Sequence, residues 1–371
     1  MSKKESEYEL KDHQLFASSR KVWKTLKAEN NIAKSKMKRA RKISLVIASL
    51  AVFRALQQYI LKFKIKDVEL KDDAPIFVIG HWRSGTTHLH YLLSQDDRYM
   101  HLSSFQAFFF NMAFTTKWFF KPILKRLMPK TRPQDNVKVD ADAPAEEEHA
   151  LVNITKMSGM HLFFFPRNML YFDKYNCFED IPSKELQEWK SIYSNLLKQI
   201  EVFNKTDKKL LLKNPHNTGR IKVLQEMYPK AKFIFIHRNP YDVFRSTITL
   251  YERAVKTQFL QEFSDEELNE LVFYCYEKMM TKYMENRKLI PANNLIEVGY
   301  DELIDNPIDA LERIYNQLSL GEFQSAKPKL KLYLKTLKAY NVNPKVQLET
   351  EIKEQIKKRW DFAFNEWGYK K

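Results

Sequence analysis

Short hydrophobic runs alternate with segments of helical periodicity through the middle of this chain. Four runs predict β-strands buried in a sheet: PIFVIG (75–80), KLLLK (209–213), KFIFIH (232–237) and NLIEVGY (294–300). Between them, segment 184–203 repeats apolar residues at helical spacing, which predicts an amphipathic helix. Strands separated by helices indicate an α/β fold in which a parallel sheet is flanked by helices.

The loops that follow these strands are the expected place for a ligand. Because ligands of parallel sheets bind at the carboxyl ends of the strands, the loops after Ile79, Lys213 and His237 are expected to surround one crevice. A helix is expected after each loop, over about 218–228 after the second and begun by Pro240 after the third.

Other parts of the chain lack this alternation. Residues 1–73 are rich in Lys and Arg, favour helix and carry no chemical motif, so we expect a basic helical N-terminal extension before a main domain at 74–371. Two aromatic-rich inserts, 104–128 and 160–172, have no clean period. They are expected either to cover a core or to line a pocket for an apolar, lipid-like molecule.

An apolar run lies inside the N-terminal extension. ISLVIASLAVF (43–53) follows the basic stretch KSKMKRARK, and it is far shorter than the roughly 20 residues needed to span a bilayer. Two interpretations stay open: a helix buried in the protein, or a helix lying on an anionic membrane surface.

Composition narrows the class of partner. The 371 residues hold 62 Lys and Arg against 46 Asp and Glu, and the net charge of +16 predicts an anionic partner. Neither Cys177 nor Cys275 has a metal-ligand spacing, so we expect two reduced thiols and no metal. The charged first residues do not resemble a secretion signal, and we expect a cytoplasmic location, with peripheral contact to the inner membrane face if the apolar run is a surface helix.

The first strand leads into a candidate phosphate loop. Gly80 to Thr87 reads G-x-x-x-x-G-T-T, which is the P-loop template with Thr86 where the lysine belongs. Backbone amides and a helix N-terminus at such a turn favour an anion. A kinase would also need a metal-binding aspartate after a second strand, but KFIFIH is followed by Arg238. A P-loop kinase whose lysine is displaced to Arg83 remains an alternative.

Two motifs in this order resemble a known family. RSGTT (83–87) resembles the 5′ loop of sulfotransferases that use 3′-phosphoadenosine 5′-phosphosulfate (PAPS), and KFIFIHRNPYDVFRS (232–246) resembles their 3′-phosphate site. The resemblance covers roughly 74–307 and is to the bacterial and tyrosylprotein-sulfotransferase-like branch. It implies a P-loop-type sheet and these donor-binding residues: Arg83, Ser84, Gly85, Thr86, Thr87, Arg238 and Ser246. An arginine suits the 3′-phosphate because its guanidinium makes bidentate contacts.

Sulfuryl transfer to an alcohol needs a base for the hydroxyl proton and cations for the charge that develops on the leaving oxygen. The resemblance implies Arg83 and Lys213 as the cations. For the base, the acidic insert at 132–151 offers Glu146 and Glu148, and a further candidate is His216. Two other histidines, His149 and His81, are also left open.

These observations predict a PAPS-dependent sulfotransferase that acts on a hydroxyl of an apolar or amphipathic acceptor such as a sterol, lipid or phenol. A non-enzymatic basic protein that binds membranes is a second alternative, but it leaves both motifs unexplained. Nucleic acid is not expected as a partner, because no aromatic platform among basic residues is apparent. The sequence does not predict the particular acceptor or the oligomeric state.

Overall fold

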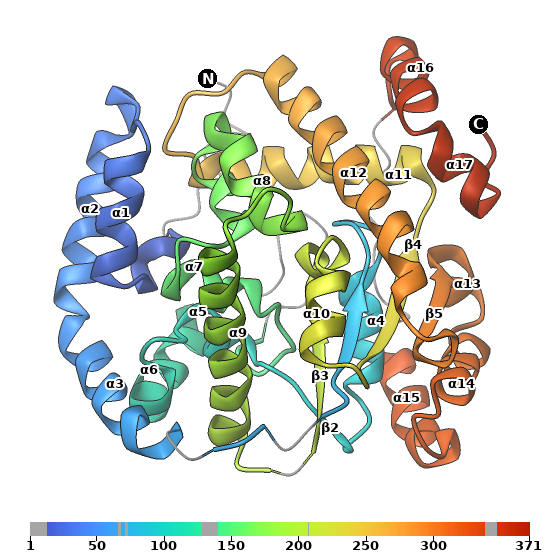
Figure 1. The fold of residues 1–371 in the computed structure, drawn as a ribbon, viewed down its shortest axis with the longest axis horizontal. Coiled ribbons are helices and arrows are strands. Elements are labelled where there is room, and N and C mark those ends of the chain that lie inside the picture. Colours follow the sequence, from blue (N-terminus) through green and yellow to red (C-terminus); the bar gives the residue numbers. More distant parts are fainter. Residues whose placement is uncertain (1–12, 66–67, 71–72, 128–139, 207, 338–346) are drawn as a thin grey trace.

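A single parallel sheet forms the centre of the computed structural model (Figure 1). The model describes residues 13–65, 68–70, 73–127, 140–206, 208–337 and 347–371. The sheet has five strands: β1 (Ile76–Ile79), β2 (Tyr99–Met100), β3 (Lys209–Lys213), β4 (Lys232–His237) and β5 (Leu295–Gly299). Their order is β2-β3-β1-β4-β5, and every neighbouring pair is parallel, which confirms the predicted fold class.

The strand interiors are buried from both sides. Along β1, Phe77 and Ile79 join the core on one face of the sheet, while Ile76 and Val78 join the core on the other. This two-sided burial explains why β1, β3 and β4 appear in the sequence as continuous apolar runs. The two-residue strand β2 has no such run and was not predicted.

Helices cover both faces of the sheet and extend beyond it (Figure 1). In the N-terminal half they are α1 (Arg20–Glu29), α2 (Met37–Ser49), α3 (Ala51–Ile65), α4 (Thr86–Leu93), α5 (Ser104–Phe108), α6 (Ala113–Leu127), α7 (Glu148–Ile154), α8 (Met169–Cys177) and α9 (Ser183–Asn204). In the C-terminal half they are α10 (Ile221–Met227), α11 (Pro240–Leu250), α12 (Asp265–Asn286), α13 (Tyr300–Asp305), α14 (Pro307–Leu318), α15 (Phe323–Leu337), α16 (Thr350–Arg359) and α17 (Asp361–Trp367).

Helix boundaries follow local chemistry. The helix predicted at 184–203 is α9, and Pro240 begins α11 as expected, with the Asn239 side chain accepting a hydrogen bond from the Tyr241 amide. The helix expected from about residue 218 begins later, at Ile221, because Pro215–Thr218 form a 3₁₀ turn after β3.

The N-terminal extension is helical, as predicted, and shares a core with the rest of the chain. Leu15, Trp23 and Ile43 belong to the same buried cluster as Phe77 of β1. No single helix in the described part of the chain is long and apolar enough to cross a membrane, although the bent pair Lys34–Ser49 and Ala51–Ile65 passes that test by length and composition when taken together.

The aromatic inserts are partly core and partly surface. Phe105, Phe110 and Phe164 are fully buried, whereas Trp118 and Leu170 are exposed. Residues 132–139 of the acidic insert lie outside the described residues. Both cysteines are buried free thiols, as expected.

Candidate active site

The loop between β1 and α4 has a backbone that few residues adopt. Gly85 has φ +102° and caps α4, and a Cβ there would lie 2.4 Å from the Tyr300 ring. Gly80 has φ +142°, and its added Cβ would lie 2.4 Å from the Ile236 carbonyl oxygen. Because the first amides of a helix have no acceptor within that helix, this tight turn presents donors at the carboxyl edge of the sheet.

The two predicted donor-binding motifs meet at this turn. Arg83 Nε donates to Ser246 Oγ at 2.9 Å, and Arg238 Nη1 donates to the Arg83 carbonyl oxygen at 3.1 Å. The two motifs converge because β4 lies beside β1 in the sheet, so their carboxyl ends are neighbours. The predicted 5′ and 3′ residues therefore form one basic cluster.

Tyr300 also belongs to this cluster, although sequence reasoning missed it. The Arg238 guanidinium stacks over the Tyr300 ring at 4.1 Å, and the same ring packs against Gly85. Arg238 Nε is buried and has no hydrogen-bond partner among the described residues. A usable signal was the position of Tyr300, directly after the last strand of the sheet.

Lys213 brings a second part of the site to the phosphate loop. At the end of β3, its Nζ donates to Thr87 Oγ1 at 3.3 Å and forms an ion pair with Glu146. Ser84 and Thr86 of the same loop are also buried. Burial raises the pKa of Glu146, but the Lys213 ammonium outweighs that effect and holds the pKa below its ordinary value. Glu146 is therefore a carboxylate next to the loop.

Glu148, the other predicted glutamate, is placed differently. Arg220 donates to both of its oxygens, at 2.7 and 3.0 Å, and Ser158 and Asn214 donate at 2.7 and 2.8 Å. Burial raises its pKa, but the Arg220 charge outweighs burial and lowers it well below the ordinary value. Both side chains of the Glu148–Arg220 pair are fully buried. These contacts occupy both carboxylate oxygens of Glu148.

Glu147, between these two, accepts hydrogen bonds from Tyr193 at 2.9 Å and Asn217 at 2.8 Å. Burial without a cation raises its pKa to about 7. Consecutive glutamates thus occupy three different environments.

The histidine candidates are buried or hydrogen-bonded to other groups. His216 Nδ1 lies 2.6 Å from Asn176 Oδ1, its ring packs edge-on against Trp82, and burial lowers its pKa to about 4. Burial also lowers the pKa of His81, to about 3. His149 hydrogen-bonds Gln14, and its ring lies 4.7 Å from that of Phe108.

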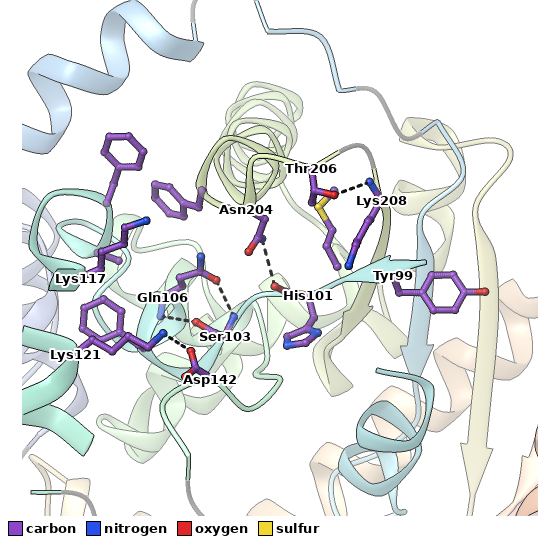
Figure 2. A pocket seen from close by; sticks show the side chains of 15 residues that line it. Tyr99, His101, Ser103, Gln106, Lys117, Lys121, Asp142, Asn204, Thr206 and Lys208 are labelled. Atoms are coloured by element: carbon purple, nitrogen blue, oxygen red, sulfur yellow. Dashed lines mark hydrogen bonds and ion pairs between the residues drawn. The ribbon is translucent and has the colours of Figure 1, made fainter. Parts of the chain in front are cut away.

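A separate cavity of about 430 Å³ lies near the other end of β3 (Figure 2). Lys208 lines it and precedes β3, whereas Lys213 ends that strand roughly 16 Å further along at about 3.3 Å per residue. Lys117 and Lys121 of α6 also face this cavity. It is distinct from the cluster around Arg83. No group of three or more His, Cys, Asp or Glu side chains suited to a metal ion occurs in the described ranges.

A phosphate-type loop after a central parallel strand, with a basic cluster from the next strand, defines the P-loop-type class of protein. The chain belongs to the sulfotransferase family: the model of that family matches residues 75–324. Membership makes the chain a sulfotransferase and decides against the kinase and the non-enzymatic alternatives.

Similar proteins are found in mycobacteria. Omega-hydroxy-beta-dihydromenaquinone-9 sulfotransferase Stf3, from Mycobacterium bovis and from Mycobacterium tuberculosis, is 33% identical over 297 residues, which cover 80% of this chain and 76% of the relative. These relatives agree with a bacterial branch, while the likeness to tyrosylprotein sulfotransferases stays a prediction.

Solved structures support the fold. Sulfotransferase STF9 from Mycobacterium avium superposes with a TM-score of 0.64 at 17% identity, covering 83% of this chain and 80% of that one. Sulfotransferase STF1 from Mycobacterium tuberculosis gives 0.58 at 19% identity, covering 91% and 90%.

Proposed function

We propose that the sulfuryl donor is PAPS and that the cluster around Arg83 binds it. The support is the convergence of two anion-binding motifs at one edge of the sheet, joined by the 2.9 Å contact between Arg83 and Ser246. The buried, unpartnered Arg238 Nε fits an additional anionic acceptor at this position. PAPS supplies the activated sulfuryl group. Arg238 and Ser246 would hold its 3′-phosphate, and residues 83–87 would hold its phosphosulfate.

We assign Glu146 as the general base. It is the candidate that pairs with Lys213 beside Thr87, and its lowered pKa keeps it ionised at neutral pH. Glu146 would take the proton of the acceptor hydroxyl as that oxygen bonds to sulfur. Lys213 and Arg83 would stabilise the negative charge on the oxygen from which sulfur departs. Glu148 fits this role less well because its oxygens are held by Arg220, Ser158 and Asn214.

We further propose that the acceptor is a hydroxyl on an apolar, lipid-like molecule. The mycobacterial relative is named for action on a hydroxylated menaquinone, which is such a molecule. The aromatic inserts at 104–128 and 160–172 supply apolar side chains of the kind that line pockets for these acceptors.

We also propose a cytoplasmic location, which the two buried free thiols support. The division into an extension at 1–73 and a sulfotransferase domain at 74–371 stays part of this proposal.

The test is incubation of the full chain with ³⁵S-labelled PAPS and a panel of acceptors, followed by mass detection of product. We expect sulfated product from a long-chain primary alcohol, a sterol or a hydroxylated isoprenoid quinone, unchanged by a chelator, and none from glucose. Sulfation confined to soluble sugars would contradict the acceptor class. Transfer from Mg-ATP but not from PAPS would contradict the donor.

A further inference from the structure

Helix α3 buries two polar side chains and exposes four large apolar ones, beside the exposed polar residues Gln58, Lys62 and Lys64. Arg54 and Gln57 face the protein, where the Gln57 side chain donates to the Phe110 carbonyl oxygen at 2.6 Å and accepts from the Phe114 amide at 2.8 Å. The exposed side carries an apolar stripe at helical spacing: Val52, Leu56, Tyr59 and Phe63. A helix that faces water has the opposite arrangement.

Helix α6 packs beside α3 and exposes two more large apolar side chains. Trp118 is 76% exposed and Ile123 is 51% exposed on α6. The two helices are joined by aromatic packing of Phe53 with Phe119 and Phe120 at ring distances of 5.6 and 5.5 Å. They lie side by side at the lower left edge of the molecule (Figure 1). We call the six exposed side chains the apolar face: Val52, Leu56, Tyr59, Phe63, Trp118 and Ile123.

Positive charge predominates around the apolar face, although Asp142 pairs with Lys121 and Lys125 of α6. Helices α2, α3 and α6 contain no aspartate or glutamate. Their exposed basic residues are Lys38, Arg41, Lys42, Lys62, Lys64, Lys117, Lys125 and Arg126. An apolar strip with tryptophan and tyrosine, on helices that carry bases and no acids of their own, matches the chemistry of an anionic bilayer interface. It does not match a second copy of the same face, because like charges would then oppose one another.

We propose that the apolar face docks the protein on the surface of an anionic lipid bilayer. The side chains of α3 and α6 insert among the lipid headgroups and acyl chain ends, and the surrounding bases contact the phosphates. The apolar run 43–53 was predicted to be either buried in the protein or placed on a membrane surface. In this proposal it is both, since Ile43 and Ile47 are buried in the protein while Val52 is exposed. This inference goes beyond the proposed function, because it concerns where the protein binds and not which group it transfers.

The test is co-sedimentation of the full chain with vesicles, without donor or acceptor. One set of vesicles contains equal parts phosphatidylglycerol and phosphatidylcholine, and the other contains phosphatidylcholine alone. The variant Leu56→Ser/Phe63→Ser/Trp118→Ser removes apolar contacts, and Lys62→Glu/Lys64→Glu reverses charge. Leu332→Ser is the matched control, because Leu332 is 66% exposed on α15, away from this face. Thermal unfolding of each variant shows that it is folded.

The wild type and Leu332→Ser are expected to bind the phosphatidylglycerol vesicles. The triple variant is expected to bind them about tenfold more weakly or worse, and the charge variant is expected to lose binding that depends on low salt. Binding of the folded triple variant at the wild-type level would overturn the inference. The inference would also be contradicted if the wild type did not bind these vesicles, or if the wild type were a dimer and the triple variant a monomer. Sulfuryl transfer plays no part in these outcomes, so they leave the proposed function to its own test.

Discussion

Two ion pairs, formed by glutamates only two positions apart, differ in burial and in the number of hydrogen bonds that hold the carboxylate. Glu146 pairs with Lys213 beside the phosphate loop, and its side chain keeps 18% of its surface exposed. Glu148 pairs with Arg220 and both side chains are completely buried. Both carboxylates have lowered pKa values, so a perturbed pKa alone does not identify the catalytic group. Access to the loop and spare hydrogen-bonding capacity separate a base from a structural anchor.

The comparison is tested most severely by removing the proposed base. Glu146→Gln keeps the shape of the side chain but cannot accept a proton, and we expect kcat to fall about 10²- to 10⁴-fold. Binding of 3′-phosphoadenosine 5′-phosphate, the donor without its sulfuryl group, should change little, as measured by calorimetry. A variant with wild-type kcat would return the role of base to His216 or Glu148.

The buried pair should affect folding more than chemistry. Glu148→Ala leaves the Arg220 charge without its partner in the protein interior, and we expect a loss of about 3–5 kcal/mol in the free energy of unfolding. The control is Glu226→Ala, which breaks an exposed pair with Lys190 and should cost about 1 kcal/mol or less. Urea unfolding measures both. Equal losses in the two variants would remove the distinction between anchor and surface pair.

Glu147 is expected to have a smaller effect on the free energy of unfolding, and that effect depends on pH. Its folded pKa of about 7 lies above the ordinary value, so the folded state binds its proton more tightly than the unfolded state does. Stability from this group is complete below the ordinary glutamate pKa and is lost as pH rises toward 7, by at most about 3 kcal/mol. Glu147→Gln resembles the protonated form and cannot ionise. The free energy of unfolding of the variant, relative to that of the wild type, should therefore increase between pH 5 and pH 8. Parallel pH profiles would contradict the raised pKa.

The sequence predicted those parts of the molecule that local patterns determine. Strands β1, β3 and β4 were predicted because burial on both faces makes them continuously apolar. The likeness of RSGTT and of Arg238 with Ser246 to family motifs pointed to the cluster that the structure assembles. The structure adds the contact between Arg83 and Ser246, which are 163 positions apart, because it depends on β4 lying next to β1.

Other features depend on partners that no local pattern specifies. The contrast between Glu146 and Glu148 arises from Arg220, 72 positions beyond Glu148, and from the end of β3. Tyr300 joins the cluster only because β5 completes the sheet beside β4. The exposed apolar stripe of α3 can be recognised only from the structure, in which Arg54 and Gln57 are buried.

Calorimetric titration with 3′-phosphoadenosine 5′-phosphate tests most directly whether the Arg83 turn and Arg238 with Ser246 hold one donor nucleotide. We expect one equivalent to bind the wild type, and Arg238→Ala and Arg238→Lys to weaken it about tenfold or more, because neither replacement restores bidentate contacts. The matched control, Arg167→Ala, removes an exposed arginine that pairs with Glu267 and should bind as the wild type does. Unchanged affinity in both Arg238 variants would contradict the account.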